Sequence, residues 1–568
     1  TFPSDVEVII KPQQSGGTDM SRKYWGNSGY PFKAGFNPKP KKVFRFKVEK
    51  LLGSLYLTKP LLERMNIKAI IDSIVPDRKE NGQIVTTGQV SEVLVANRLH
   101  HPRPLRDIEE WAELCGIEEL YGLKPENLND DRLGRALEDL DQYFEEIETT
   151  LALHVIKEFG LNLEEILWDT TSIYFEGEYD SSELIRFGYG EKSDLKQLKV
   201  ALNVEKESGI PLRADVLNGN RTDVAIVVEN LKKLRRALKK EELLFTGDNA
   251  MGTIPNCLLL NDQNIRFIAP CPASSLFEQA IDSVDEEELD LLVFPDKDGT
   301  PKFKVTERGV FIDLPDRDTK EDLKKVKPFW ARCLIIWSKS KSKLEKEKRA
   351  KYINDIKERL EDIALTKLNK RRYKDKEYAQ NQVDKCFQGP KHYLRKVFGN
   401  PTVADKQGRL ELVYALNEEL LKRIEKKDGL YPVVTNVYDQ SYTTRELFLR
   451  TRRKYSVEQP MRYLKSKIKI RPVFLHTEER IRGLALITFI ALMAYCILEH
   501  LAKQNLNPKA TTHQLMKEFA SIVFSEGEML DGTHFQTVGN VKERHIELIN
   551  KLGLAIGSYA VINEVLLE

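Results

Sequence analysis

The chain has few cysteines for its length, and their spacing forms neither a metal site nor a disulfide framework. Six cysteines and nine histidines are spread over 568 residues. No C-x-x-C pair occurs, and the histidines do not cluster with the cysteines. A zinc site and structural disulfides are therefore not expected, and a reducing, cytoplasmic setting fits this composition.

The chain also lacks a marked excess of charge of either sign. Its 89 basic and 87 acidic residues leave a net charge of +2. A nucleic-acid binder that is basic all over is excluded, so any contact with DNA must come from local patches. The composition, 41% hydrophobic and 31% charged, indicates folded cores, and the length favours several domains.

No apolar run is long enough to cross a bilayer. The longest run, residues 483–498, has 16 residues and falls short of the roughly 20 that a membrane helix needs. Arg480, Arg482 and Glu499 flank it closely. We therefore expect a buried core helix here and no membrane partner.

The spacing of apolar residues changes along the chain and indicates several regions. Residues 1–42 are rich in Gly, Pro, Ser and Lys without a steady period, and we expect a poorly ordered tail. Residues 43–160 carry apolar residues at helical spacing and predict an all-α domain. Residues 276–436 mix strand-like segments with one charged helix and predict a β-rich insertion domain. Residues 506–568 predict a C-terminal helical region.

Between these regions the sequence predicts a mixed sheet. Three antiparallel strands, one amphipathic helix and two strands reached by crossovers follow one another, which is the order of the ribonuclease H-like fold. The segments are residues 164–177, 197–206, 210–219, 222–240 (the helix), 242–251 and 265–272. We therefore expect an α/β protein with an RNase H-like core over residues 161–275 that resumes at 437–505.

Two of the predicted strands lead from a buried apolar run to a single acid. Residues 166–168 (Ile-Leu-Trp) precede Asp169, and residues 243–245 (Leu-Leu-Phe) come shortly before Asp248. In a ribonuclease H-like sheet these strands are neighbours, so the two carboxylates can face each other. Carboxylate oxygens are ligands that Mg²⁺ prefers, so the pair predicts half of a metal site.

A third acid lies on the helix predicted for residues 443–468. Glu458, Arg462 and Lys465 are spaced i, i+4 and i+7, so they share one helix face. An apolar stripe lies beside this face: Val457, Met461 and Leu464. Phosphoryl transfer with two metal ions usually needs a third acid, which Glu458 can supply. The alternative is an ordinary surface ion pair between Glu458 and Arg462, and Pro460 counts against a regular helix here.

Four segments resemble the DDE transposases of bacterial insertion sequences. They are residues 167–177, 188–223, 243–251 and 457–492. The resemblance runs from about residue 85 to 505. Within the family, the chain most resembles the group with a β-rich insertion between the second Asp and the Glu. It implies a DNA transposase that cuts the ends of an insertion sequence and transfers the strands into target DNA.

Carried over by position, the resemblance implies a catalytic triad of Asp169, Asp248 and Glu458. These acids would hold two Mg²⁺ or Mn²⁺ ions for phosphodiester hydrolysis and transesterification. The partner would be double-stranded DNA, as terminal inverted repeats and as target, and a homodimer would hold two ends together. The protein would work in the bacterial cytoplasm, at the nucleoid.

The family's signature around the Glu, Y-x2-R-x3-E-x6-K, is partly kept. Its positions hold Thr451, Lys454, Glu458 and Lys465, so the Glu and the Lys match. Basic and aromatic residues predict further contacts with backbone phosphates or with an extruded base. The candidates for DNA contact are Lys454, Arg462, Lys465, Thr451, Tyr431, Lys192, Lys196, Arg371 and Arg372. The alternatives are a core position for Tyr431 and solvated surface faces for the cations.

Two classes of function are open from the sequence. The first is an active transposase, which the three intact acids favour. The second is a DNA-binding protein derived from a transposase that no longer cuts, which the replaced positions 451 and 454 favour. Inverted repeats on both sides of the coding region would support the first class.

The core offers no obvious element that reads bases, so we predict that the domain of residues 43–160 recognises the element ends. Basic residues gather at a break between its helices: Arg98, His100, His101, Arg103 and Arg106. Deletion of residues 1–160 should leave only salt-sensitive binding that does not distinguish these ends from scrambled DNA. Competition between the two DNAs measures this, and an unchanged preference would place recognition elsewhere in the chain.

Overall fold

The chain folds into two compact units. The first comprises residues 1–162, 171–220 and 456–568, and the second comprises residues 163–170 and 221–455. The computed structural model describes residues 44–76, 84–188, 192, 194–314, 323–439, 442–452, 455–468, 475, 477–529 and 534–555. The tail predicted for residues 1–42 lies outside these ranges.

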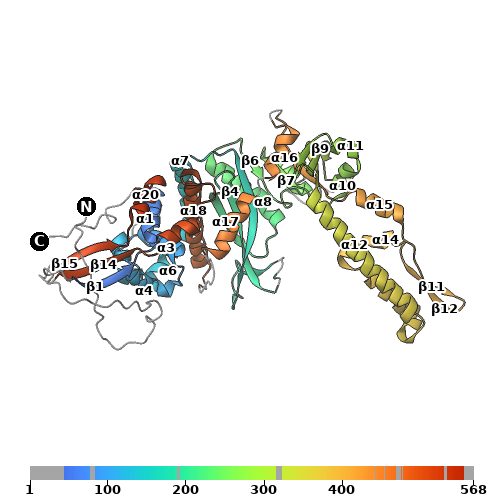
Figure 1. Cartoon of the computed structure of the whole chain (residues 1–568), viewed down its shortest axis with the longest axis horizontal. Helices are drawn as coiled ribbons and strands as arrows, with labels where there is room; N and C mark the ends of the chain where they lie inside the picture. Colours follow the sequence, from blue (N-terminus) through green and yellow to red (C-terminus); the bar gives the residue numbers. More distant parts are fainter. Residues whose placement is uncertain are drawn as a thin grey trace, which may run out of the picture. The chain divides into compact units, whose positions relative to one another are not determined.

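The first unit is built around α18 (Glu478–Asn505), which contains the predicted core helix. It packs against α3 (Thr87–His100) and α6 (Asp130–Gln142) (Figure 1). Gly483 permits a close approach, because a Cβ there would lie 2.1 Å from the carbonyl oxygen of Leu137 on α6. Within the described ranges, α18 is the one helix long and apolar enough to cross a membrane, yet 94% of its apolar window is buried inside the protein. The prediction of a buried core helix is confirmed.

Other helices surround α18 in this unit. They are α1 (Leu55–Arg64), α2 (Ile67–Ile74), α4 (Ile108–Leu114), α5 (Ile117–Tyr121), α7 (Phe144–Glu158), α19 (Thr512–Glu518) and α20 (Glu543–Lys551). The helical pattern predicted for residues 43–160 is thus largely present.

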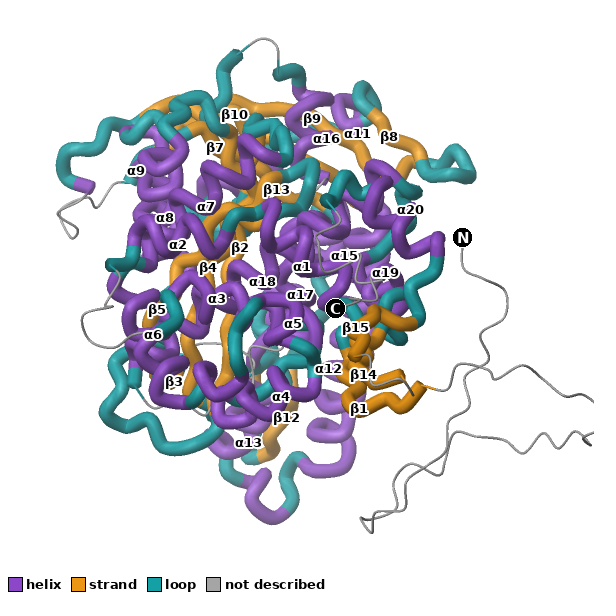
Figure 2. The backbone as a smooth tube through the Cα atoms, turned by 90° about the vertical axis from the view of Figure 1, so that its left-hand side faces the viewer, coloured by secondary structure: helices purple, strands orange, loops and turns teal. Residues whose placement is uncertain are grey.

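A small antiparallel sheet departs from the sequence prediction. β1 (Phe44–Leu51) pairs with β14 (Val523–Met529), and β14 pairs with β15 (His534–Gly539); Figure 2 shows the three strands together. β1 lies in the region predicted to be all-α, and the other two lie in the region 506–568 predicted to be helical. β1 pairs with a segment far along the chain, with Phe44 opposite Met529. The local sequence of either segment therefore does not reveal its partner strand.

A β-hairpin completes the first unit. β4 (Lys196–Glu205) pairs antiparallel with β5 (Pro211–Asn218) and, through its first two residues, with β3 (Arg186–Phe187). β5 packs against α7 and α18. Arg213 of β5 forms an ion pair at 3.2 Å with Glu148 of α7, and burial raises the pKa of Glu148 to about 8.

The second unit holds a mixed sheet in the order β2-β6-β7-β13-β10-β9-β8. β2 (Glu165–Phe175), whose last residues belong to the first unit, runs parallel to β6 (Leu244–Thr246), and β6 runs parallel to β7 (Arg266–Pro270). α8 (Asp223–Leu238) and α9 (Ile254–Asp262) precede β6 and β7 as crossovers. The remaining strands are antiparallel: β13 (Leu430–Thr435), β10 (Phe329–Ser338), β9 (Pro301–Ile312) and β8 (Val293–Pro295). The predicted α/β class with a mixed sheet is confirmed.

The strands predicted for a separate insertion, residues 276–436, extend this same sheet. β13 pairs with β7, with Val433 opposite Pro270. One core draws apolar side chains from both regions: Leu244, Ile268, Leu334 and Val433. Helices α10 (Ser275–Asp282), α11 (Glu286–Leu289) and α16 (Thr444–Arg452) pack on its strands. The local periodicity predicted these strands correctly, but it did not show that β13 pairs with β7.

Part of this region forms an arm, residues 339–429, with a core of its own (Figure 1). It consists of α12 (Lys339–Glu361), a π-helical segment (Asp362–Lys367), α13 (Lys376–Lys385), α14 (Leu394–Val397), β11 (Thr402–Lys406), β12 (Arg409–Val413) and α15 (Glu418–Lys426). Leu360, Phe387 and Phe398 are buried among these elements. At its base, the Ser338 N–H donates to the carbonyl oxygen of Gly429 at 3.0 Å, so the arm leaves and rejoins the sheet at paired positions.

Two of the basic residues at the predicted DNA-reading break pack inside the first unit, Arg98 buried and His100 half-buried. Arg98 is 5% exposed, and its Nη2 donates to the carbonyl oxygen of Arg103 at 2.6 Å. Burial lowers the pKa of Arg98 to about 10. His100 packs beside Trp111, whose Nε1 donates to its Nδ1 at 3.4 Å. Arg98 is thus occupied by the main chain and His100 contacts Trp111. The DNA contact of this break stays a prediction.

His100 should make the first unit sensitive to acid. Burial lowers its pKa to about 4 from the ordinary 6.5, so between these values the unfolded chain binds a proton that the folded chain does not. Stability should be full above pH 6.5 and fall as the pH drops toward 4, by at most about 3 kcal/mol. Thermal unfolding across this range should show a smaller loss in His100→Gln than in wild type. His513→Gln, at an exposed histidine of α19 in the same unit, is the control, and equal pH profiles for all three proteins would contradict the assignment.

Candidate active site

Asp169 and Asp248 occupy equivalent positions on two neighbouring parallel strands. The last pair between β2 and β6 is Leu167↔Thr246. Each acid lies two residues beyond its member of that pair, so both stand at the same level along the two strands, just past the point where the pairing ends. Both side chains are half-buried. The second unit therefore brings these two predicted acids together.

Main-chain hydrogen bonds orient the two carboxylates. Asp169 Oδ1 accepts the N–H of Thr170 at 2.8 Å, and Asp248 Oδ1 accepts the N–H of Ala250 at 3.0 Å. The preceding residue of β2, Trp168, is fully buried. The backbone of each acid is thus held in the core, while its carboxylate is partly exposed to solvent.

The first turn of α8 is tied to both acid-bearing segments. Thr170 Oγ1 donates to Asp223 Oδ1 at 2.7 Å. The buried amide Nδ2 of Asn256, on α9, donates to the carbonyl oxygens of Val224 at 2.9 Å and Ala250 at 2.8 Å. Sequence reasoning missed Asp223 and Asn256 as positioning residues, because their partners lie far from them in the chain.

The turn that carries Asp248 requires glycine at position 252. A Cβ there would lie 1.9 Å from the carbonyl oxygen of Pro270 on β7, which is impossible without movement of the neighbouring backbone. A Cβ at Gly247 would meet only the flexible side chain of Met251, with Cε at 2.5 Å. Asp248 is therefore held close against the sheet, although it follows the end of its strand.

A buried carboxylate fixes the pairing of β2 with β6. Glu165, at the start of β2, is 3% exposed and accepts hydrogen bonds from Thr246 Oγ1 at 2.7 Å and from Arg450 Nη1 of α16 at 2.7 Å. An unpaired carboxylate here would cost several kcal/mol, so these contacts favour this one pairing of the strands. An acid at the start of an apolar strand was the only sequence signal for it.

Glu458 lies in the first unit, on α17 (Tyr455–Ser466). The predicted faces are present: Glu458, Arg462 and Lys465 are exposed, and Val457, Met461 and Leu464 are buried. Within the described ranges, Glu458 and Arg462 form no ion pair, so the surface-pair alternative is not supported. The approach of Glu458 to the two aspartates stays a prediction.

Contacts with α18 fix the orientation of α17. The Tyr463 hydroxyl donates to Glu499 Oε2 at 2.8 Å, and Gln459 Nε2 donates to Glu499 Oε1 at 2.6 Å. Burial raises the pKa of Tyr463, so it stays a proton donor at neutral pH. The helix continues through Pro460, and these bonds on both sides of the proline contribute to holding it.

Two candidates for DNA contact have local partners instead. Thr451 Oγ1 donates to the carbonyl oxygen of Phe448 at 2.7 Å within α16. Tyr431, on β13, is half-buried against the apolar core of the sheet, and burial raises its pKa. The core position that the sequence left open for Tyr431 fits this environment.

The remaining cationic candidates differ in their surroundings. Lys192 is exposed, with Nζ 5.6 Å from the ring centre of Tyr174, and Lys196 forms an ion pair with Asp180. In the arm, a 3₁₀ turn (Arg371–Lys374) holds the exposed Arg371 and Arg372. Lys454 lies outside the described residues.

The pair of aspartates has the donor chemistry of a hard cation. Carboxylate oxygens suit Mg²⁺ or Mn²⁺, whereas zinc and copper sites usually include imidazole or thiolate. Within the described part of the chain, no group of three or more His, Cys, Asp or Glu side chains is placed to hold a metal ion. The six cysteines are all buried and unpaired.

Comparisons with known proteins cover most of the chain. The family model "Transposase DDE domain" matches residues 163–494, and the model of a domain of unknown function, DUF4277, matches residues 47–153. No curated protein sequence matches the chain. Among solved structures, the piggyBac transposase in a synaptic complex with hairpin DNA is similar, with 7% identity and a TM-score of 0.37, over 83% of this chain and 80% of that one.

Asn256→Ala should destabilise the second unit at the turn that carries Asp248. The change removes the side-chain donor to the carbonyl oxygen of Val224 and leaves that of Ala250 with the weaker bond from Thr253 Oγ1 at 3.2 Å, a loss on the order of 1–3 kcal/mol. Denaturant unfolding should show this loss. Asn249→Ala, at an exposed position beside Asp248, should change stability by less than about 0.5 kcal/mol. Equal stability of the two variants would show that the Asn256 amide does not hold the turn.

Proposed function

The chain belongs to the DDE transposase family, and on that premise we propose that it cuts DNA at the ends of a mobile element and joins the freed 3′ ends to target DNA. The family match over residues 163–494 spans more than half of the chain. The observation that carries the proposal is the equivalent placement of Asp169 and Asp248 on β2 and β6. A structural role does not require two half-buried acids at matched positions on neighbouring strands.

Asp169, Asp248 and Glu458 would together hold two Mg²⁺ ions. When bound, such ions lower the pKa of an attacking water and stabilise the oxygen that leaves the phosphorus. The carboxylate donors of the aspartate pair fit this group, and the resemblance gives Glu458 as the third acid. Asp169, on the buried strand β2, would be the least replaceable of the three.

We place the catalytic core in the ribonuclease H-like class. The supporting features are the antiparallel pair β4 and β5 in the first unit and, in the second unit, β6 and β7, which follow helical crossovers and run parallel to β2 and to each other. In this arrangement the two aspartates come from the first strand and from the fourth strand in chain order. Residues 276–436 would then be the insertion that separates the second Asp from the Glu.

Exposed cations would bind the DNA backbone around the acids. Arg462 and Lys465 share a face of α17 with Glu458, so they suit phosphates near the cleaved bond. Arg371 and Arg372 on the arm suit phosphates farther along the duplex. Two chains would hold two element ends, because strand transfer needs both ends in one complex.

Asp169→Asn should abolish strand cleavage and preserve DNA binding. The amide keeps the shape of the side chain but removes a charged oxygen ligand, so the loss should reach at least 10³-fold, about 4 kcal/mol of transition-state stabilisation. Cleavage of end-bearing duplex in Mg²⁺ and gel-shift binding measure the two properties. Asp262→Asn, at an exposed position on α9, is the matched control. Cleavage by Asp169→Asn at the wild-type rate would remove Asp169 from the active site.

A second variant tests whether the aspartate binds metal. A thiolate prefers softer ions than Mg²⁺, so Asp248→Cys should lose cleavage in Mg²⁺ and regain part of it in Mn²⁺. Wild-type protein that binds the element ends but cuts in neither metal would support the non-cleaving alternative.

A further inference from the structure

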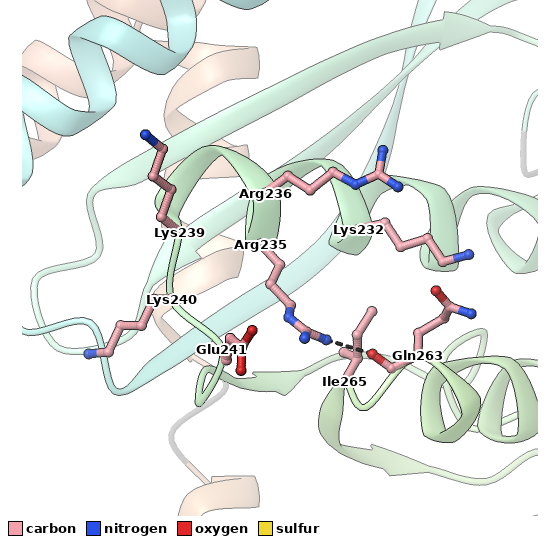
Figure 3. Close-up of a pocket in the computed structure, with 8 residues that line it drawn as sticks. All are labelled: Lys232, Arg235, Arg236, Lys239, Lys240, Glu241, Gln263 and Ile265. Atoms are coloured by element: carbon pink, nitrogen blue, oxygen red, sulfur yellow. Dashed lines mark hydrogen bonds between the residues drawn. The ribbon is translucent and has the colours of Figure 1, made fainter.

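A cavity of about 410 Å³ lies in the second unit where α8 ends (Figure 3). Five cations line it: Lys232, Arg235, Arg236, Lys239 and Lys240. Glu241 is the one acid of the lining, so the cavity carries a large excess of positive charge. We infer that this basic cavity binds backbone phosphates of duplex DNA at a distance from the cleaved bond, an inference that rests on the proposed function.

Two of the cations are held by main-chain oxygens rather than by acids. Arg235 Nη1 donates to the carbonyl oxygens of Gln263 at 2.6 Å and Asn264 at 3.1 Å. Lys240 Nζ donates to the carbonyl oxygen of Leu163 at 2.5 Å. A carbonyl group orients a cation without neutralising it. The charge of both side chains is therefore kept in the cavity.

The other three cations form no ion pair within the described ranges of the chain. Lys232, Arg236 and Lys239 are spaced i, i+4 and i+7 along α8, and like charges at such spacing destabilise a helix by a few tenths of a kcal/mol per pair. Arg236 and Lys239 are exposed, and Lys232 is half-buried. These side chains are open to a ligand from solution.

The helix dipole explains only part of this charge. Cations in the last turn of a helix are stabilised by its negative end, and the effect falls off within that turn. Lys232 lies two turns before the C-cap, Lys239, so the dipole does not account for it. Lys239 itself has φ of +50°, a left-handed conformation for which glycine or asparagine is the usual residue. A lysine is thus kept at a position where its backbone is strained.

The spread of the cations favours an extended polyanion over one small anion. Figure 3 shows Arg235 pointing from α8 toward Gln263, Lys232 to one side, and Lys239 and Lys240 to the other. A single phosphate would be reached by few of them, whereas successive backbone phosphates would meet several. Duplex DNA presents phosphates about every 3.4 Å along each strand.

The cavity and the two aspartates lie at different levels along the same strands. Lys240 contacts Leu163, just before β2, whereas Asp169 lies six residues farther on. At about 3.3 Å per residue, this is roughly 20 Å along the strand, the rise of about six base pairs. The cavity is therefore separate from the proposed catalytic residues, yet within the length of an element end.

The test compares two charge-matched triple variants of the full chain. One is K232Q/R236Q/K239Q, in the cavity, and the other is K422Q/R423Q/K426Q, at three exposed cations of α15. Binding to a duplex of several helical turns is measured from low to high salt. The cavity variant should lower the slope of log affinity against log salt by about 2–3, because each phosphate contact contributes about 0.9. The α15 variant should lower it by less than one.

Equal slopes for the two variants would overturn the inference, because the cavity would then add nothing beyond total charge. Competition by inorganic phosphate at constant ionic strength tests whether the cavity is instead a site for one small anion. The inference would also be overturned if phosphate binds the wild type but not the cavity variant while the salt slope of DNA binding is the same in both proteins. Cleavage at saturating DNA should be unchanged in the cavity variant. Loss of cleavage in every protein, wild type included, would instead reject the proposed function and leave the slopes interpretable.

A single substitution keeps the test valid if the triple variant does not fold. Lys239→Gly removes one cation and relieves the left-handed strain, so its Tm should rise by about 2 °C while its salt slope falls by about 0.9. Gln407→Gly, at another exposed residue with φ of +56°, relieves similar strain without removing a charge. It should gain stability with no change in DNA binding. A Lys239→Gly protein with wild-type DNA binding would contradict a role for Lys239 in the cavity.

Discussion

The parallel pairing of β2 with β6 is the constraint on which the candidate site depends. A slip of one residue between the strands would turn every side chain of one strand to the opposite face. Asp169 and Asp248 would then no longer stand together. The buried Glu165 opposes such a slip, since its bonds to Thr246 and Arg450 form only in the observed register. A carboxylate that takes no part in the chemistry thus determines where the two aspartates lie.

A second set of contacts transfers this order to the surrounding helices. Thr170 and Asn256 tie the first turn of α8 to the two acid-bearing segments. Gly252 lets the intervening turn pack on β7. The aspartates are consequently supported from a strand, a turn and a helix, which leaves them little freedom to separate under their mutual repulsion. Such support fixes the position of a side chain before any ligand binds.

Sequence reasoning recovered the elements whose signal is local. β2, β4, β5, α8 and α18 have strong apolar periodicity, and the acids Asp169 and Asp248 stand out because each follows a buried run. The pairing of β1 with β14 and the attachment of β13 to β7 could not be recovered. Both depend on partners far along the chain, and the residue pattern of a strand does not show which other strand it pairs with. The packing of Arg98 and His100 inside the first unit was missed for the same reason, since their charge suggested a surface position.

The arm joins the sheet of the second unit at one pair of facing positions. Residues 339–429 depart from β10 and return to β13 at positions that face each other, where Ser338 and Gly429 share a hydrogen bond. The two strands would remain an antiparallel hairpin if the whole excursion were replaced by a short turn. The cost of closing a loop grows only slowly with its length. The length of the arm therefore places little constraint on the pairing of β10 with β13, and the sheet that carries the aspartates does not depend on the arm for its strand order.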